Sequence, residues 1–234
     1  LAALARGEVD GVGGLTPIDA QRARTLKNVS LYSLPTNDFT ALFLNLRPDR
    51  AVFRDRAVRR AIATAIDRAR ILQLAVDGRG TLADEIVPQT SWAYVKDVAR
   101  YPRSLAEAKA LLDAADWKDH DGDGVRDKGD VSLTFTLTTS DDPGRYAAGV
   151  QVVEDLRAIG MRVELRAMPL AEVVDTVARR RAFDALLIGI SRGGDPDPYE
   201  FLHSSRARDP GHNFSGYSTL PMDRSLEAAR RTFD

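Results

Sequence analysis

Hydrophobic positions in the second half of the chain change period several times, and this change predicts alternating strands and helices. Apolar or alternating runs typical of strands cover 131–139, 161–167 and 183–190. Helical spacing covers the two intervening segments, 145–159 and 171–180. Strand–helix–strand–helix–strand order favours an α/β fold with a mixed, mostly parallel sheet flanked by helices.

The first half of the chain carries shorter patterns. Short apolar or alternating runs predict strands at 9–12, 29–34 and 40–46. Ser104 and Glu107 form a capping box, in which each side chain satisfies a free amide at a helix start. The remaining predicted helices cover 17–26, 55–76, 105–117, 199–204 and 222–233.

Composition restricts the class of protein. A 44% hydrophobic content provides for a sizeable core in 234 residues. The 33 basic and 34 acidic side chains give a net charge of −1, which gives no support for a nucleic-acid partner. The chain has no cysteine, so disulfides and thiolate chemistry are excluded. The sequence starts without Met and without a signal-peptide charge pattern, and we interpret it as an excised domain.

The loop after the buried run 185–190 is the first candidate binding site. It contains Arg192, Gly194 and Asp195 among prolines, and ligands collect beyond the carboxyl ends of strands in open α/β sheets. The alternative interpretation is an ordinary turn whose aspartates cap the following helix. The loop 78–102, which contains Trp92 and Tyr94, is long and aromatic, and such loops fold over a core or a ligand.

An acidic loop at 119–130 matches the spacing of a calcium loop. Its candidate ligands follow positions one, three, five, seven, nine and twelve: Asp119, Asp121, Asp123, Val125 (through its carbonyl), Asp127 and Asp130. Position twelve is Asp where Glu is usual, and a strand follows where a helix is expected. The loop therefore predicts either a structural Ca²⁺ site or a hydrated Asp/Gly turn.

Catalysis has little support in the sequence. The three histidines are not spaced as metal ligands, and no GxSxG or phosphate-binding glycine loop is present. Asp195 and Asp197 would form an acid/base pair only if both faced one cleft. We predict a protein that is not an enzyme and requires no cofactor.

Several segments in order resemble the extracytoplasmic solute-binding proteins of peptide/nickel ABC transporters, family 5. The resemblance covers nearly the whole chain. It rests on LARGEVD at 4–10, LFLNL at 42–46, 53–72, SLAEAKALLDAADW at 104–117, DGDGVRDKG at 121–129, 149–165, 183–202 and 213–230.

This resemblance implies a Venus flytrap fold, of which residues 1–234 would be the single second lobe. It also implies a small-molecule or peptide ligand held between this lobe and the missing first lobe, permease subunits as partners, and a periplasmic or extracytoplasmic location, with or without a lipid anchor. The family's amine-binding Asp falls on Gly194 or, shifted by one residue, on Asp195. Arg192 is the candidate for an anionic group, and Trp92 and Tyr94 for stacking. The alternative function is a calcium-stabilised structural or adhesion module.

Overall fold

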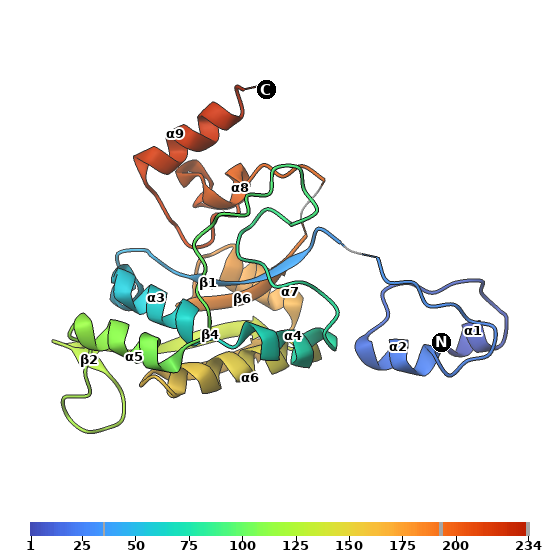
Figure 1. Cartoon of the computed structure of the whole chain (residues 1–234), viewed down its shortest axis with the longest axis horizontal. Coiled ribbons are helices and arrows are strands. Elements are labelled where there is room, and N and C mark those ends of the chain that lie inside the picture. Colours follow the sequence, from blue (N-terminus) through green and yellow to red (C-terminus); the bar gives the residue numbers. More distant parts are fainter. Residues whose placement is uncertain (35, 192–193, 233–234) are drawn as a thin grey trace.

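The computed structural model describes residues 1–34, 36–191 and 194–232, and its centre is a mixed sheet (Figure 1). The strands are β1 (Phe39–Leu44), β2 (Asp127–Lys128), β3 (Val131–Ser132), β4 (Thr134–Ser140), β5 (Arg162–Met168) and β6 (Ala185–Ile190). Strands β2 and β3 form a separate hairpin. The main sheet has the order β1-β6-β4-β5, with β4 parallel to β5 and β6, and β1 antiparallel to β6. The predicted α/β fold with a mostly parallel sheet is confirmed.

Helices cover both faces of this sheet. The helical segments are α1 (Ala2–Ala5), α2 (Pro17–Ala23), η1 (Ala51–Arg54), α3 (Arg56–Ala65), α4 (Arg68–Val76), α5 (Leu105–Ala114), α6 (Pro143–Arg157), α7 (Leu170–Glu172), the π-helical η2 (Val173–Ala178), α8 (Tyr199–Leu202), η3 (Ser204–Arg206) and α9 (Leu220–Ala229). None of the described helices is long and apolar enough to cross a membrane.

Alternation along β6 divides the core into two clusters. Ala185 and Leu187 pack with α3, α5 and α6, whereas Leu186 and Ile188 pack with η2 and Phe214. A strand buried on both faces needs apolar residues at successive positions, which explains the continuous apolar run. The sheet is therefore covered on both faces. The loop that follows β6 begins at the carboxyl ends of the parallel strands.

Two predicted strands are absent. Residues 9–12 and 29–34 have no regular structure in the described chain, and Tyr32 and Leu34 are more than four-fifths exposed. A strand is stable only when its backbone groups pair with a neighbour, and an alternating pattern does not supply that neighbour. These residues belong to the arm, which we define as residues 1–34. Figure 1 shows the arm, with α1 and α2, beside the rest of the molecule.

The predicted helix over 55–76 is broken into α3 and α4. Ile66 is extended, and the Asp67 side chain caps α4 by accepting from the Arg70 N–H at 2.8 Å. The Asp67 N–H, which would otherwise continue the helix, donates to Oδ2 of the buried Asp155 at 2.8 Å. An Asp side chain can hydrogen-bond to nearby backbone N–H groups and thereby competes with helical hydrogen bonds. Asp67 therefore favours the start of a helix over the interior of one.

Candidate functional site

A small hollow lies where the loop after β6 meets the loop between α4 and α5. We call it the loop hollow; its volume is about 210 Å³. Its lining residues are Asn37, Pro88, Thr90, Ser91, Trp92, Gly194, Asp195 and Pro196. Three of the predicted binding residues, Trp92, Gly194 and Asp195, thus lie together although about 100 positions separate them.

Trp92 and Tyr94 occupy different environments. Trp92 is 87% exposed and presents its indole at the rim of the loop hollow. The turn that carries it is held by the Ser91 N–H, which donates to the Pro88 carbonyl at 2.9 Å. Tyr94 is half-buried and is not one of the lining residues. Of the two aromatic candidates for stacking, Trp92 lines the loop hollow and Tyr94 does not.

Asp195 and Asp197, the two aspartates of the loop after β6, make different contacts. Asp195 lines the loop hollow, and its Oδ1 accepts from the Asp197 N–H at 2.9 Å. Asp197 accepts from the Tyr199 N–H at 3.0 Å and pairs with the Arg230 guanidinium at 2.6 Å. Because Asp197 is held by Arg230 and does not line the hollow, this geometry does not favour an acid/base pair. It does agree with the helix-capping alternative for Asp197.

Gly194 is open toward solvent, and a Cβ added there would meet no atom within 4 Å. The glycine is therefore not required for close packing at this point. Arg192, the predicted anion-binding residue, lies outside the described residues. Sequence reasoning did not single out Asn37, which precedes β1 and enters the loop hollow because β1 pairs with β6. The pairing of β1 with β6 joins segments that are far apart in the chain, so no local sequence pattern around Asn37 predicts it.

The acidic loop brings together three of its six predicted calcium ligands. Carboxylate oxygens of Asp119, Asp121 and Asp123 lie within 4.8 Å of one another. The N–H of Val125, followed by the Arg162 guanidinium at 2.9 Å, holds the pKa of Asp123 below its ordinary value.

The other two predicted carboxylate ligands, Asp127 and Asp130, are not part of that group. Asp127 accepts from the His120 N–H and contacts its Nδ1 at 2.8 Å. Asp130 is exposed and is not part of the acidic group, and the Val125 side chain packs in the core. The metal site stays a prediction.

A calcium ion that binds only the folded loop must raise the melting temperature, since binding to one state shifts the equilibrium toward it. The prediction is checked by melting the protein in millimolar CaCl₂ and in EGTA, with Asp121→Asn as the variant that removes one central carboxylate. MgCl₂ serves as the control for ionic strength. Equal midpoints in CaCl₂ and EGTA would remove the calcium assignment.

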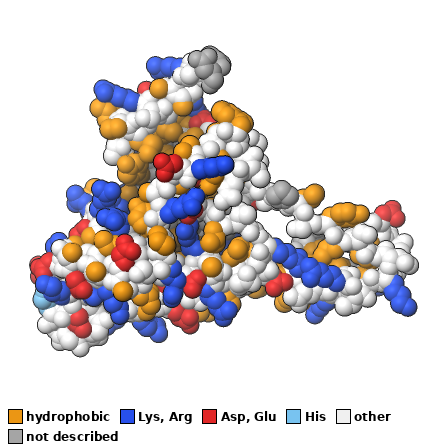
Figure 2. Space-filling view, viewed as in Figure 1, with side chains coloured by type: hydrophobic (Ala, Val, Ile, Leu, Met, Phe, Trp, Pro, Cys, Tyr) orange, Lys and Arg blue, Asp and Glu red, His pale blue; other side chains and the backbone are white. Residues whose placement is uncertain are grey.

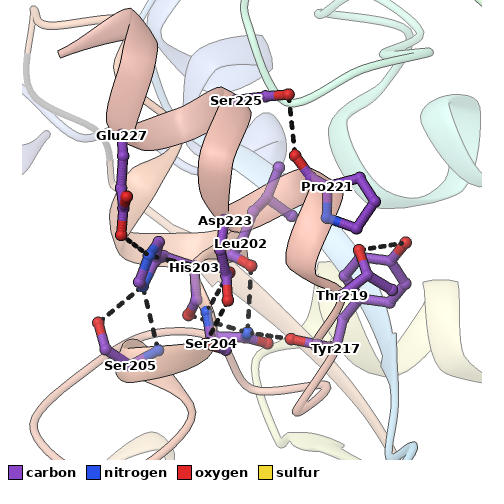
Figure 3. A network of polar contacts seen from close by, with 11 residues as sticks. Leu202, His203, Ser204, Ser205, Tyr217, Thr219, Pro221, Asp223, Ser225 and Glu227 are labelled. Carbon is purple, nitrogen blue, oxygen red and sulfur yellow. Dashed lines mark hydrogen bonds and ion pairs between the residues drawn. The ribbon is translucent and has the colours of Figure 1, made fainter. Parts of the chain in front are cut away.

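The segment after the loop is fixed to α9 by a polar network (Figure 3). Asp223 accepts from the Ser204 hydroxyl at 2.6 Å and from the Ser204 N–H at 2.9 Å. The buried His203 ring lies below, with Nε2 3.4 Å from Glu227 Oε1, and it stacks on Tyr199. Together with the Asp197–Arg230 pair, these contacts fix the downstream end of the loop that follows β6.

The Asp223 interaction predicts a pH dependence of stability. The Ser204 hydroxyl and then the Ser204 N–H lower the pKa of Asp223. A carboxyl whose pKa is lowered by folding stabilises the protein above its unfolded pKa, about 4, and loses that contribution as the pH falls through its folded pKa. Asp223→Asn is therefore expected to unfold at lower urea than the wild type at pH 7, with the difference shrinking below about pH 4.

Asp175→Asn, at an exposed pair with Arg179, is the matched control and should change the midpoint little. A gap between Asp223→Asn and the wild type that stays constant from pH 7 to about pH 2.5 would contradict the assignment.

The sequence and the fold of this chain are similar to those of known solute-binding proteins. The family model described as bacterial extracellular solute-binding proteins, family 5, matches residues 1–213. The oligopeptide-binding protein AppA of Bacillus subtilis is 33% identical over 189 residues, which cover 78% of this chain and 34% of AppA. The dipeptide-binding protein of Escherichia coli is 23% identical over 220 residues, 93% of this chain and 39% of that protein.

Solved structures agree with the sequence matches. AppA of Bacillus subtilis in complex with a nonapeptide superposes with a TM-score of 0.87 at 29% identity, covering all of this chain and 46% of AppA. NikZ of Campylobacter jejuni in complex with Ni(L-His) gives 0.84 at 25% identity, again over 46% of its chain. The chain thus spans less than half the length of these relatives.

Proposed function

Because the chain belongs to the bacterial extracellular solute-binding proteins of family 5, we propose that it is a ligand-binding lobe that captures oligopeptides or a similar small solute for an ABC importer. The observation that carries the proposal is the loop hollow, which joins Trp92 to Gly194 and Asp195 beyond the carboxyl end of β6. Ligands of open α/β folds collect at this edge. The matches to peptide-binding relatives favour a peptide over other solutes.

Each lining residue has a chemical role in this proposal. Asp195 is the anionic anchor for the α-amine of the ligand, since an ion pair supplemented by a hydrogen bond is strong in a partly closed site. The indole ring of Trp92 provides a flat apolar surface on which a side chain or peptide plane of the ligand stacks. The ligand is bound and released unchanged, so no catalytic group is needed.

The proposal includes a first lobe and a membrane partner. Exposed apolar side chains gather on the arm (Figure 2), and they would be covered by the other lobe of the same protein; these are Val9, Val12, Ile18, Leu31, Tyr32 and Leu34. Ligand held between two lobes is sequestered when the lobes close. A closed binding protein would then dock on permease subunits outside the cytoplasmic membrane.

The test is calorimetric titration of the intact binding protein with peptides from dipeptides to nonapeptides, and with non-peptide solutes such as a nickel–histidine complex. The proposed function predicts saturable heat with peptides of at least one length. Absence of binding to every peptide would contradict the peptide assignment, and binding to the nickel complex alone would reassign the solute class.

A calcium-stabilised structural module remains the second candidate, favoured by the grouping of Asp119, Asp121 and Asp123. The two functions are separated by the same sample. A structural module would gain stability from CaCl₂ and show no peptide binding, whereas a binding lobe must bind peptide in the presence of EGTA.

A further inference from the structure

The arm contacts the rest of the molecule at the end of α4. Gln21, on α2 of the arm, donates from its Nε2 to Asp77 Oδ2 at 3.3 Å, and Figure 1 shows α2 beside the end of α4. Of the hydrogen bonds and ion pairs among the described residues, this is the one that joins the arm to the rest of the chain, which we call the body. Asp77 is therefore the polar contact point between the arm and the body.

Asp77 is an unfavourable residue for its position in the backbone. It is the C-cap of α4 and has a φ of 55°, in the left-handed region that favours glycine. Its negative charge also lies at a helix C-terminus, where the helix dipole favours cations. Glycine would fit this position better, so the local structure does not explain the carboxylate. The contact with Gln21 does explain it.

The Asp77 carboxylate has a second candidate partner in Arg79. Arg79 Nη2 is buried and has no hydrogen-bond partner, although it lies only 3.7 Å from Asp77 Oδ2. A buried donor without an acceptor is costly. A small rotation of the Asp77 side chain away from Gln21 would supply that acceptor. Loss of the contact with the arm is therefore partly offset by a new contact within the body.

The contact between Gln21 and Asp77 holds the arm in a position where the loop hollow is uncovered. None of the lining residues belongs to the arm, and Trp92 at the rim is 87% exposed. A hydrogen bond weakens steeply when its partners move apart by a few tenths of an ångström. The Gln21–Asp77 bond therefore cannot persist when the arm rotates relative to the body.

We propose that Gln21 and Asp77 form a reversible latch that stabilises the open form of the binding protein. This inference rests on the proposed function, in which the arm moves with the first lobe. Closure over a ligand breaks the Gln21–Asp77 bond, and the Asp77 carboxylate then accepts from Arg79. The apparent affinity of a ligand falls with the fraction of the protein that is in the closed form. The latch therefore lowers the affinity and keeps the empty site accessible.

The test is calorimetric titration of the intact protein and its variants with the peptides that bind the wild type. Gln21→Ala removes the latch and leaves Asp77 free to contact Arg79, so the affinity should rise about 2-fold to 10-fold. Gln21→Lys brings an ammonium group to the Asp77 carboxylate and should lower the affinity about 2-fold to 5-fold.

Both effects should disappear when the same substitutions are made in an Asp77→Gly background, because the acceptor of the latch is then absent. Asp77→Gly places the favoured residue at a left-handed position, so this background should fold as well as the wild type. Arg24→Ala, exposed at the C-cap of α2, is the control and should keep the wild-type affinity.

The inference is overturned if Gln21→Ala and Gln21→Lys shift the affinity in the same direction, or leave it unchanged. It is also overturned if their effects persist in the Asp77→Gly background, because they would then not depend on the latch. Each of these results, in a wild type that binds peptide, leaves the proposed function standing. A wild type that binds no peptide overturns the proposed function itself, and the inference with it.

Discussion

Replacing Asp195 with Asn is expected to weaken binding of peptides with a free amino terminus about 10-fold to 100-fold, or about 1.5–3 kcal/mol. Asn keeps the shape of the side chain and its acceptor for the Asp197 N–H, so the loop should keep its conformation. What it loses is the negative charge that the proposed function assigns to the α-amine of the ligand in the loop hollow. Calorimetry on the intact protein measures the change directly.

N-acetylated peptides provide the decisive comparison for Asp195. They lack the cationic group, so they should bind the wild type and Asp195→Asn with the same weak affinity. Asp175→Asn, an exposed carboxylate in η2, should leave both peptide classes unaffected. Equal losses for free and acetylated peptides would show that Asp195 acts on the fold of the loop and not on the amine.

Gly194→Asp decides between the two alignments of the family's amine-binding Asp. The position has space for a side chain, since a Cβ there meets nothing within 4 Å. If the amine lies nearer to Gly194, the added carboxylate should restore affinity to Asp195→Asn. If Asp195 is itself the anchor, the double variant should stay as weak as the single one.

Replacing Leu137 with Ala should lower the free energy of unfolding by about 2–5 kcal/mol. Leu137 is in the middle of β4, is 0% exposed and packs in the cluster that joins the sheet to α3, α5 and α6. Truncation leaves a cavity that neighbouring strands on both sides prevent from closing. Urea unfolding followed by circular dichroism measures the loss.

Leu170→Ala is the matched control for this substitution. Leu170 is 51% exposed at the start of α7, so the same truncation there should change stability by less than about 0.5 kcal/mol. Equal losses at Leu137 and Leu170 would contradict the assignment of the core.

Sequence patterns predicted the parallel part of the fold well because there the local period and the tertiary contacts agree. The run 185–190 is apolar at successive positions, and β6 does pack on both faces. The runs 9–12 and 29–34 are shorter or alternating strand-like patterns, yet they form no strand in the described chain. A strand needs a partner, and the partner is not encoded in the run itself. Asp67, by contrast, was a local signal for a helix start within the predicted helix over 55–76.

The candidate site was predicted in pieces rather than as a whole. Trp92 and Asp195 were each notable for their own loop, and only the fold brings them to one hollow.

The pair between Asp197 and Arg230 ties the loop that follows β6 to the residue at the end of α9. Arg230, 33 positions after Asp197, holds this loop through the ion pair. The shape of the loop therefore depends on whether the polypeptide extends to residue 230. Cleavage before residue 230 would keep every lining residue in the chain and yet remove the ion-pair partner of Asp197, which follows the lining residues Asp195 and Pro196. A fluorophore attached to α9 should, for the same reason, respond when a ligand occupies the loop hollow.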